Sequence, residues 1–303
     1  MRLLVADKID ESALSILQKR TIKTDCQFDI SPEQLLVKIE NYQGLIVRSR
    51  TKVTKEILEK GINLAIIGRV GSGVDNIDTD CCKKRNIVVI NSPEANSQAV
   101  AEMTIGFMLM LIRRMGVATD SMKRGLWLKK ELKGGELFGK TIGVVGYGHI
   151  GQKVAKLADA FGCKVLYKGK SKKNSSFENI FREADLITIH IPLVSQTRGL
   201  IGEKFLKLMK RDAYIINTSR GEIIDEDFLY LMLSQNLIKG AALDVFWQEP
   251  LPAGSRWRKL ENVLLTPHIA ASTKEALQKA SMEVAEDIIR FNNDEKLISQ
   301  FLG

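Results

Sequence analysis

The chain has 303 residues, of which 45% are hydrophobic and 27% charged, a composition typical of a globular protein and not of a disordered or fibrous one. The length is sufficient for two domains of ordinary size. The formal net charge is +9, but aromatic residues are only 6% and no nucleic-acid-binding motif is present. The charge therefore favours a lysine-rich surface that attracts small anions over a nucleic-acid partner.

Short apolar runs rich in Val and Ile alternate with amphipathic stretches along the whole chain. Such runs are typical of strands buried on both faces of a parallel sheet. In chain order the predicted strands are residues 3–6, 44–47, 64–68, 87–90, 142–145, 165–167, 186–189, 214–217, 241–245 and 263–265. The alternation predicts an α/β fold built from doubly wound parallel sheets.

Several helix ends are marked by their residues. Ser31, Pro32 and Gln34 form an N-cap, a proline at the first helical position and a capping box. Thr54 precedes a helical stretch, and Gly61 follows it as a C-cap. The longest apolar run, within residues 103–112, is shorter than the roughly 20 residues that a bilayer span needs. We therefore expect a buried helix there and no membrane partner.

Two polar links divide the sequence. Residues 92–97 precede a long helical stretch from Gln98, and residues 267–272 lead into a last helix over 273–292. If that helix returns to the first sheet, residues 1–96 and 273–303 form one discontinuous domain. Residues 97–272 then form the other domain.

The sequence gives two indications of location. Asp7 and Asp10 interrupt the region where the apolar core of a signal peptide would lie. The four cysteines show no C-x-x-C spacing. Both observations favour reduced thiols in the cytoplasm, with no metal site.

The segment from Gly146 to Gly151 reads G-Y-G-H-I-G and matches the G-x-G-x-x-G pattern of dinucleotide-binding turns. It follows a predicted strand and opens a predicted helix. Gly146 permits the tight turn, Gly148 allows close approach of a pyrophosphate, and Gly151 allows the helix to pack closely on the strand. This context predicts a dinucleotide-binding domain.

The end of the next predicted strand bears on cofactor choice. An acidic residue there would bind the ribose of NAD, but the sequence continues with Lys168, Gly169 and Lys170. A basic loop of this kind would hold the 2′-phosphate of NADP(H); alternatively it is a mobile lysine loop that contacts nothing. Both NAD(H) and NADP(H) stay open at this point.

Three further polar segments each end a predicted strand, where ligands bind in open α/β sheets. They contain Arg220, Glu249 and His268. Histidine suits a base that removes a hydroxyl proton as a hydride leaves. A carboxylate fixes the tautomer of the imidazole, and an arginine holds a substrate carboxylate.

Each of these three residues alone also fits a structural role. His190 is expected to shape the loop after its strand, and His149 to lie beside a pyrophosphate without chemistry.

With these segments in order, the chain resembles the D-isomer-specific 2-hydroxyacid dehydrogenases, most closely the branch that acts on 3-phosphoglycerate. The resemblance covers nearly the whole chain and rests on residues 44–51, 68–78, 91–97, 146–151, 218–221, 244–250 and 267–269. It implies a Rossmann cofactor domain inserted into a flavodoxin-like substrate domain, and a homodimer formed with help from the apolar helix after Ser97.

The resemblance also implies roles for individual residues. Arg220, Glu249 and His268 would be catalytic. Asp244 would hold the nicotinamide amide, and the other cofactor contacts would come from Gly146, Gly148, His149, Ile150, Gly151, Lys168, Gly169, Lys170, His190, Pro192 and Thr218. The substrate contacts would be Arg48, Ser49, Arg50, Val70, Gly71 and Ser72, with backbone N–H groups of the last three around the substrate carboxylate and the two arginines at its far end.

The chain departs from the family pattern in four places. Gly169 stands where an aspartate is usual, His149 replaces a common arginine, and the stretch 168–184 is shortened. Because the sequence ends at Gly303, we expect no regulatory domain of the kind that some members carry after this point.

The resemblance implies hydride transfer between a nicotinamide cofactor and a D-2-hydroxy or 2-keto acid. The favoured pair is 3-phosphoglycerate and 3-phosphohydroxypyruvate, in serine biosynthesis. The alternatives are reduction of glyoxylate or hydroxypyruvate and, in another class, a dinucleotide-sensing binding protein like the corepressors that share the fold.

Overall fold

The computed structural model describes residues 1–301, which fold into two compact units. Unit 1 comprises Met1–Asn96 and Ser272–Gly303, and unit 2 comprises Ser97–Ala271. The last two positions of the predicted substrate domain, 302–303, lie outside the described residues. Within the described part of the chain, no helix has the length and apolar character needed to cross a membrane.

Unit 1 contains a five-stranded parallel sheet in the order β2-β1-β3-β4-β5. The order matches that of flavodoxin-like folds, which confirms the predicted class. The strands are β1 (Arg2–Val5), β2 (Lys23–Cys26), β3 (Gly44–Val47), β4 (Ile66–Arg69) and β5 (Val88–Asn91).

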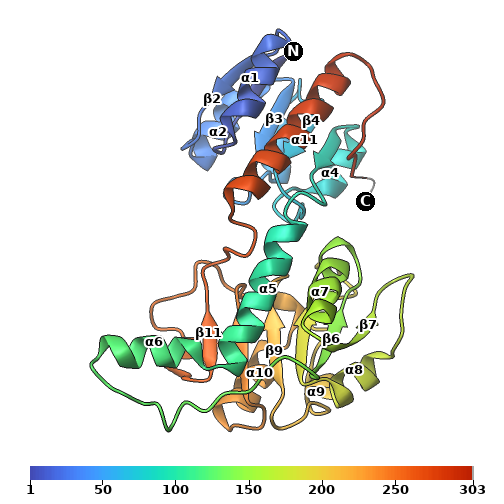
Figure 1. Cartoon of the computed structure of the whole chain (residues 1–303). Helices are drawn as coiled ribbons and strands as arrows, with labels where there is room; N and C mark the ends of the chain where they lie inside the picture. Colours follow the sequence, from blue (N-terminus) through green and yellow to red (C-terminus); the bar gives the residue numbers. More distant parts are fainter. Residues whose placement is uncertain (302–303) are drawn as a thin grey trace. The chain divides into compact units, whose positions relative to one another are not determined.

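Helices cover both faces of this sheet, as Figure 1 shows. One face carries α1 (Glu11–Lys19) and α11 (Lys274–Asn292), whose apolar residues pack on those of β1, β3 and β4. The other face carries α2 (Pro32–Lys38), α3 (Lys55–Lys60) and α4 (Thr79–Lys84), with the short helix η1 (Ile39–Asn41). The capping box at Ser31 and the caps Thr54 and Gly61 form as predicted.

The last helix joins unit 1 although it lies some 180 residues after β5 in sequence. Gly68 of β4 makes this packing possible, since a Cβ at that position would lie only 2.5 Å from a methyl carbon of Val284 in α11. The buried carboxylate of Asp287 then accepts hydrogen bonds from the N–H groups of Ile298 and Ser299. These contacts fix α11 and the segment after it on the sheet.

Unit 2 contains a six-stranded parallel sheet in the order β11-β10-β9-β8-β6-β7. Its strands are β6 (Thr141–Val145), β7 (Lys164–Lys168), β8 (Leu186–Ile189), β9 (Tyr214–Asn217), β10 (Gly240–Leu243) and β11 (Val263–Leu265). In the usual dinucleotide-binding order, 3-2-1-4-5-6, another strand lies outside the second one. Here β7 is an edge strand, which is where the shortened stretch 168–184 falls.

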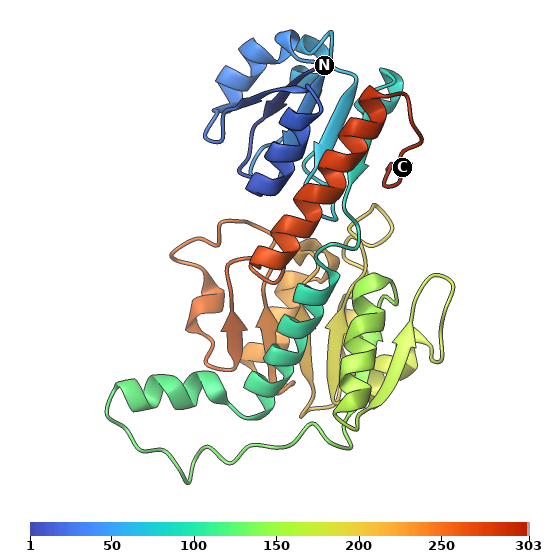
Figure 2. The same ribbon diagram turned by 45° about the horizontal axis from the view of Figure 1, so that its top comes forward.

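Helices also cover both faces of the second sheet (Figures 1 and 2). The helices α5 (Ser97–Ile112) and α7 (His149–Ala160) pack on one face. The helices α8 (Phe177–Glu183), α9 (Glu203–Leu206) and α10 (Glu226–Ser234) pack on the other. The remaining elements are α6 (Met115–Lys123), η2 (Gly221–Ile223) and η3 (Arg256–Lys259). Figure 2 shows α6, in green, leading away from the sheet into a long connection to β6.

Every predicted strand is present, and the structure adds one strand that the sequence did not predict. The ends of β3, β8, β9 and β11 match the predicted ranges, and the others shift by one or two residues at an end. The strand β2 was not predicted. It lies at the sheet edge and reads KTDC, with burial that is partial or absent, so it has no apolar run to identify it.

Candidate active site

The glycine motif forms a tight turn from β6 into α7. Gly146 has φ of +99°, and a Cβ there would lie 2.3 Å from the carbonyl oxygen of His190. A Cβ at Gly151 would lie 2.0 Å from the carbonyl oxygen of Gly146, so helix and turn touch directly. At Gly148, by contrast, a Cβ would meet nothing within 4 Å. The space beside Gly148, at the N-terminus of a 12-residue helix, suits a pyrophosphate.

Two buried polar atoms just after the neighbouring strands β8 and β9 have no hydrogen-bond partner: Nδ1 of His190, after β8, and Oγ1 of Thr218, after β9. Burial lowers the pKa of His190 to about 3, so the ring is neutral at physiological pH, with Nε2 lying 2.9 Å from the Thr188 hydroxyl. Buried polar atoms in folded proteins are nearly always paired. A ligand at the carboxyl ends of β8 and β9 would supply the missing partners, so these residues fit a bound dinucleotide.

The central pair of the site is His268 and Glu249. Nδ1 of His268 lies 2.7 Å from Oε2 of Glu249, and Oε1 of Glu249 accepts the N–H of Phe246 at 3.0 Å. Burial opposes ionisation of Glu249, but the hydrogen bonds from His268 and Phe246 and the charges of His268 and Arg220 outweigh it and lower its pKa. The carboxylate is therefore ionised and holds one ring nitrogen, which leaves Nε2 for chemistry.

Arg220 lies close enough to Glu249 for its charge to act on that carboxylate. The loop that carries it is shaped by Asn217, whose side chain donates to the Arg220 carbonyl at 2.8 Å and accepts the Ser219 N–H at 3.0 Å. The three residues predicted to be catalytic thus come together in unit 2, although they are separated by up to 48 positions in the chain.

Asp244 is fully buried at the end of β10. One of its carboxylate oxygens accepts the Ile269 N–H and the other the Ala270 N–H, both at 2.8 Å, and the Thr266 hydroxyl also donates to it. Its backbone carbonyl accepts the N–H of His268 at 2.8 Å, and His268 has a φ of +54°. In this structure Asp244 holds the loop that presents the histidine.

Two of the predicted substrate residues of unit 1, Arg48 and Arg50, contact a different buried carboxylate, that of Asp7. It accepts the N–H of Arg48 at 2.6 Å and Nε of Arg50 at 2.8 Å. The Arg50 guanidinium also donates to the carbonyls of Ala6, Phe28 and Ile30. Arg50 is thus largely used in holding the loop, whereas the Arg48 guanidinium makes one long bond, 3.3 Å, to the Lys8 carbonyl. Ser49, between them, is exposed.

Two of the three predicted backbone donors have partners within unit 1. The N–H of Val70 donates to the Val47 carbonyl, and that of Gly71 donates to Oγ of Ser92. Ser72 is the remaining candidate. Its hydroxyl accepts a bond from Asn96, whose Oδ1 is buried without a partner. Asn96 is a candidate substrate contact that the motif analysis missed, because an asparagine in a polar link reads simply as turn chemistry.

The remaining predicted cofactor residues occupy the ends of unit 2 elements. His149 and Ile150 begin α7, Lys168 ends β7, Gly169 and Lys170 follow it, and Pro192 lies in the loop after β8. Within the described part of the chain, no group of His, Cys, Asp or Glu residues is arranged to hold a metal ion.

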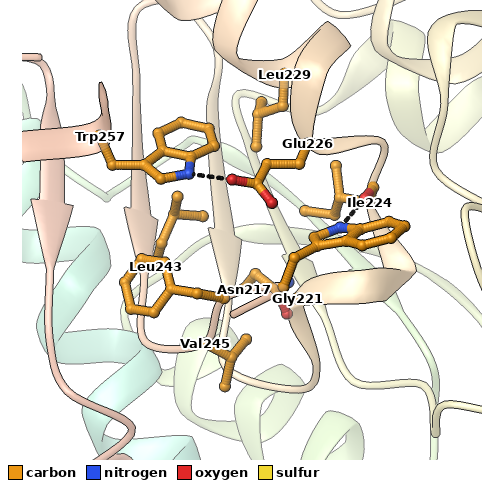
Figure 3. Close-up of a pocket in the computed structure, with 10 residues that line it drawn as sticks. Asn217, Gly221, Ile224, Glu226, Leu229, Leu243, Val245 and Trp257 are labelled. Carbon is orange, nitrogen blue, oxygen red and sulfur yellow. Dashed lines mark hydrogen bonds between the residues drawn. The ribbon is translucent and has the colours of Figure 1, made fainter. Parts of the chain in front are cut away.

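A small pocket lies beside the loops that carry Arg220 and Glu249 (Figure 3), with about 250 Å³ of space that is partly open to solvent. Its lining is mostly apolar, and the two indole N–H groups beside it are already bonded, Trp247 to the Ile224 carbonyl and Trp257 to Glu226. The pocket therefore offers little polar chemistry of its own. It contributes to packing between the loops that carry Arg220 and Glu249.

Unit 2 is a Rossmann-type domain with a glycine turn, two unpaired polar atoms at the carboxyl ends of its strands and a His–Glu pair. These features define the class of dinucleotide-binding proteins. Residues 105–270 match the model of the D-isomer specific 2-hydroxyacid dehydrogenase, NAD binding domain. The chain belongs to this family, which confirms the resemblance seen in the sequence. The matched model is that of an NAD-binding domain, and solved structural neighbours contain NADPH in one case and NAD in two others.

Individual relatives cover most of the chain. It is 43% identical to D-3-phosphoglycerate dehydrogenase of Methanocaldococcus jannaschii over 95% of its length, but spans only 57% of that protein. It is 40% identical to hydroxypyruvate reductase of Thermotoga maritima over 95% of its length and 97% of that protein. The structure of an acyclic imino acid reductase, Bsp5, with NADPH and D-Arg superposes over 100% of both chains with a TM-score of 0.92 and 32% identity.

Proposed function

We propose that the protein is an oxidoreductase that transfers a hydride between a nicotinamide cofactor and carbon 2 of a small D-2-hydroxy or 2-keto acid. The observation that carries this proposal is the 2.7 Å pair of His268 Nδ1 and Glu249 Oε2 beside Arg220, within a family NAD-binding domain. Such a pair supplies the proton transfer that oxidation of an alcohol requires.

The histidine moves the proton. Because Nδ1 donates to Glu249, Nε2 is the atom that takes the hydroxyl proton in oxidation and returns it in reduction. Glu249, whose pKa is lowered, stays ionised and stabilises the imidazolium formed on the way.

Arg220 supplies positive charge for the substrate carboxylate and for negative charge that develops on the C2 oxygen. A bound nicotinamide supplies or accepts the hydride. The residues proposed to hold the dinucleotide are Gly146, Gly148, Gly151, His190 and Thr218. The family resemblance adds Asp244 to this set, and Asp244 also positions the loop that carries His268.

For the substrate we favour the pair 3-phosphoglycerate and 3-phosphohydroxypyruvate, supported by the names of the relatives and by Arg48 for a phosphate tail. Glyoxylate or hydroxypyruvate is the second candidate, supported by the Thermotoga relative. A panel of 2-keto acids assayed with NADH and NADPH tests both. Replacing Arg48 should raise KM for 3-phosphohydroxypyruvate far more than for glyoxylate, and equal effects would argue against a phosphate site.

The catalytic assignment is tested by replacing the base. His268→Ala should lower kcat about 10²–10⁴-fold with folding intact. His149→Ala is a matched control, since that histidine is assigned no proton transfer, and it should lower kcat far less. Near-normal turnover in His268→Ala would overturn the assignment. A corepressor-like binding protein would instead bind the dinucleotide and turn over none of the keto acids.

We further propose a homodimer in a reducing compartment, the cytoplasm. The helix α5 packs within unit 2, whereas the segment after it exposes Met115, Met122, Leu126, Trp127 and Phe138, of which Trp127 is 75% exposed. Apolar surface of this kind marks an interaction site, which supports the dimer. The four cysteines are all free, which supports a reducing compartment. Sedimentation should give a dimer for the wild type and a weaker one for Trp127→Glu.

A further inference from the structure

We propose that the loop after β7, residues 168–173, binds the 2′-phosphate of NADP(H), so that the chain prefers NADP(H) to NAD(H). The inference rests on the proposed nicotinamide-dependent function and specifies its cofactor. Four of the six residues in this loop are lysines, 168, 170, 172 and 173, and the fifth polar residue is Ser171. No carboxylate occurs from Lys164 to Asn174, so the charge of the loop is not compensated within it.

The loop is a defined hairpin and not a loose excursion. Lys168 and Lys173 form an antiparallel bridge, and the Gly169 N–H donates to the Lys172 carbonyl at 2.8 Å. Asn174 anchors its return: Oδ1 accepts the Tyr167 N–H at 2.7 Å, and Nδ2 donates to the Val165 carbonyl at 2.9 Å. The asparagine side chain pairs with the edge of β7 where the usual fold would have a further strand. The hairpin therefore presents its lysines at a fixed place on the sheet.

That place adjoins the dinucleotide turn. The Gly146 N–H donates to the Lys168 carbonyl at 2.8 Å, and the ring of Tyr147, inside the glycine motif, stacks on Tyr167 with centroids 3.7 Å apart. In dinucleotide-binding folds the adenosine ribose lies at the end of the second strand, next to the glycine turn. The basic hairpin thus occupies the position that reads the ribose 2′ substituent.

Position 169 has no room for the carboxylate side chain that NAD enzymes use there. A Cβ at Gly169 would lie 2.9 Å from the Cβ of Tyr147 and 3.1 Å from its backbone nitrogen. An aspartate there would have to displace the glycine turn itself. The site has therefore lost the acceptor for a ribose 2′-hydroxyl and gained several cationic donors, which suit a phosphate of charge about −1.5 to −2.

The experiment uses fragments that need no hydride chemistry. Isothermal titration of the full chain with 2′,5′-ADP and with 5′-AMP compares two ligands that differ only in the 2′-phosphate. We expect 2′,5′-ADP to bind about tenfold or more tightly, the gain typical of charge-assisted contacts. In Lys170→Ala/Lys172→Ala the ratio of the two dissociation constants should fall towards one.

Lys129→Ala/Lys130→Ala is the matched control, because it removes the same charge from the exposed connection before β6. It should keep the wild-type ratio. Equal affinity of the wild type for both fragments, or a ratio that survives the Lys170/Lys172 change, would overturn the proposal. If 5′-AMP and NADH bind and NADH supports turnover while the ratio is one, only the cofactor inference fails and the proposed dehydrogenase function stands.

Discussion

Gly221 lies directly against the backbone of Phe246, so that a Cβ on Gly221 would come within 2.2 Å of the Phe246 carbonyl carbon. The contact joins the loop that carries Arg220 to the loop that carries Glu249. Since both partners are backbone, neither can yield by a change of rotamer. The close approach is therefore part of how the guanidinium is held near the carboxylate.

Gly221→Ala should consequently push the two loops apart. We expect a loss of about 1–3 kcal/mol in the free energy of unfolding, typical of overpacking, together with a fall in kcat larger than that of a distant glycine variant. Urea denaturation and steady-state kinetics measure the two effects. Gly254→Ala is the control, because a Cβ there meets nothing within 4 Å. Equal behaviour of the two variants would contradict the close-contact argument.

Asp244 gives a second prediction, about positioning. In Asp244→Asn the amide NH₂ must face either the Ile269 or the Ala270 N–H, replacing an acceptor with a donor. The variant should lose about 1–3 kcal/mol of stability, and kcat should fall because the loop that presents His268 is loosened. Amide hydrogen exchange should show faster exchange at residues 269–270. Unchanged exchange there would mean that the carboxylate does not hold the loop.

Arg50 and Arg48 offer a matched pair in unit 1. Arg50 joins the Asp7 carboxylate and three carbonyls, so Arg50→Met should lower the free energy of unfolding by roughly 1–3 kcal/mol. Arg48 contributes its backbone N–H to Asp7, which Arg48→Met retains, so that change should cost little stability and act on KM for a phosphorylated substrate. Urea midpoints and KM values separate the two. A loss of stability in Arg48→Met with a KM effect in Arg50→Met would contradict this assignment of the two arginines.

The sequence predicted most of the fold because buried parallel strands leave apolar runs and because residues such as Ser31 mark helix starts through their own hydrogen bonds. The grouping of Arg220, Glu249 and His268 could be predicted from their positions after strands, since parallel strands end at one edge of a sheet. The hydrogen-bond partners of individual groups could not be predicted from the sequence. Nothing in the sequence shows that the Gly71 N–H donates to the Ser92 hydroxyl, or that the Arg50 guanidinium donates to Asp7 and three carbonyls.

The edge of unit 2 illustrates the same limit. The shortening of residues 168–184 was visible, but its structural result was not: β7 becomes an edge strand, and the side chain of Asn174 pairs with its backbone. A single side chain that bonds to the backbone of an edge strand leaves no periodic pattern in the sequence. Only the three-dimensional contacts distinguish the ordered hairpin from the mobile loop that the lysines alone would also fit.

His190 makes stability depend on pH. Its pKa is lowered by burial to about 3 in the folded state, against 6.5 as the ordinary value, so the unfolded chain binds more protons between these limits. The stabilising effect of the neutral ring is complete above pH 6.5 and is lost as the pH falls towards 3, with a limiting slope of about 1.4 kcal/mol per pH unit. Urea unfolding of the ligand-free protein at pH 7 and pH 5 measures this loss. His190→Gln, which does not titrate, should show a drop smaller by about 2 kcal/mol over this interval. An equal drop in wild type and variant would show that His190 is not buried as a neutral ring.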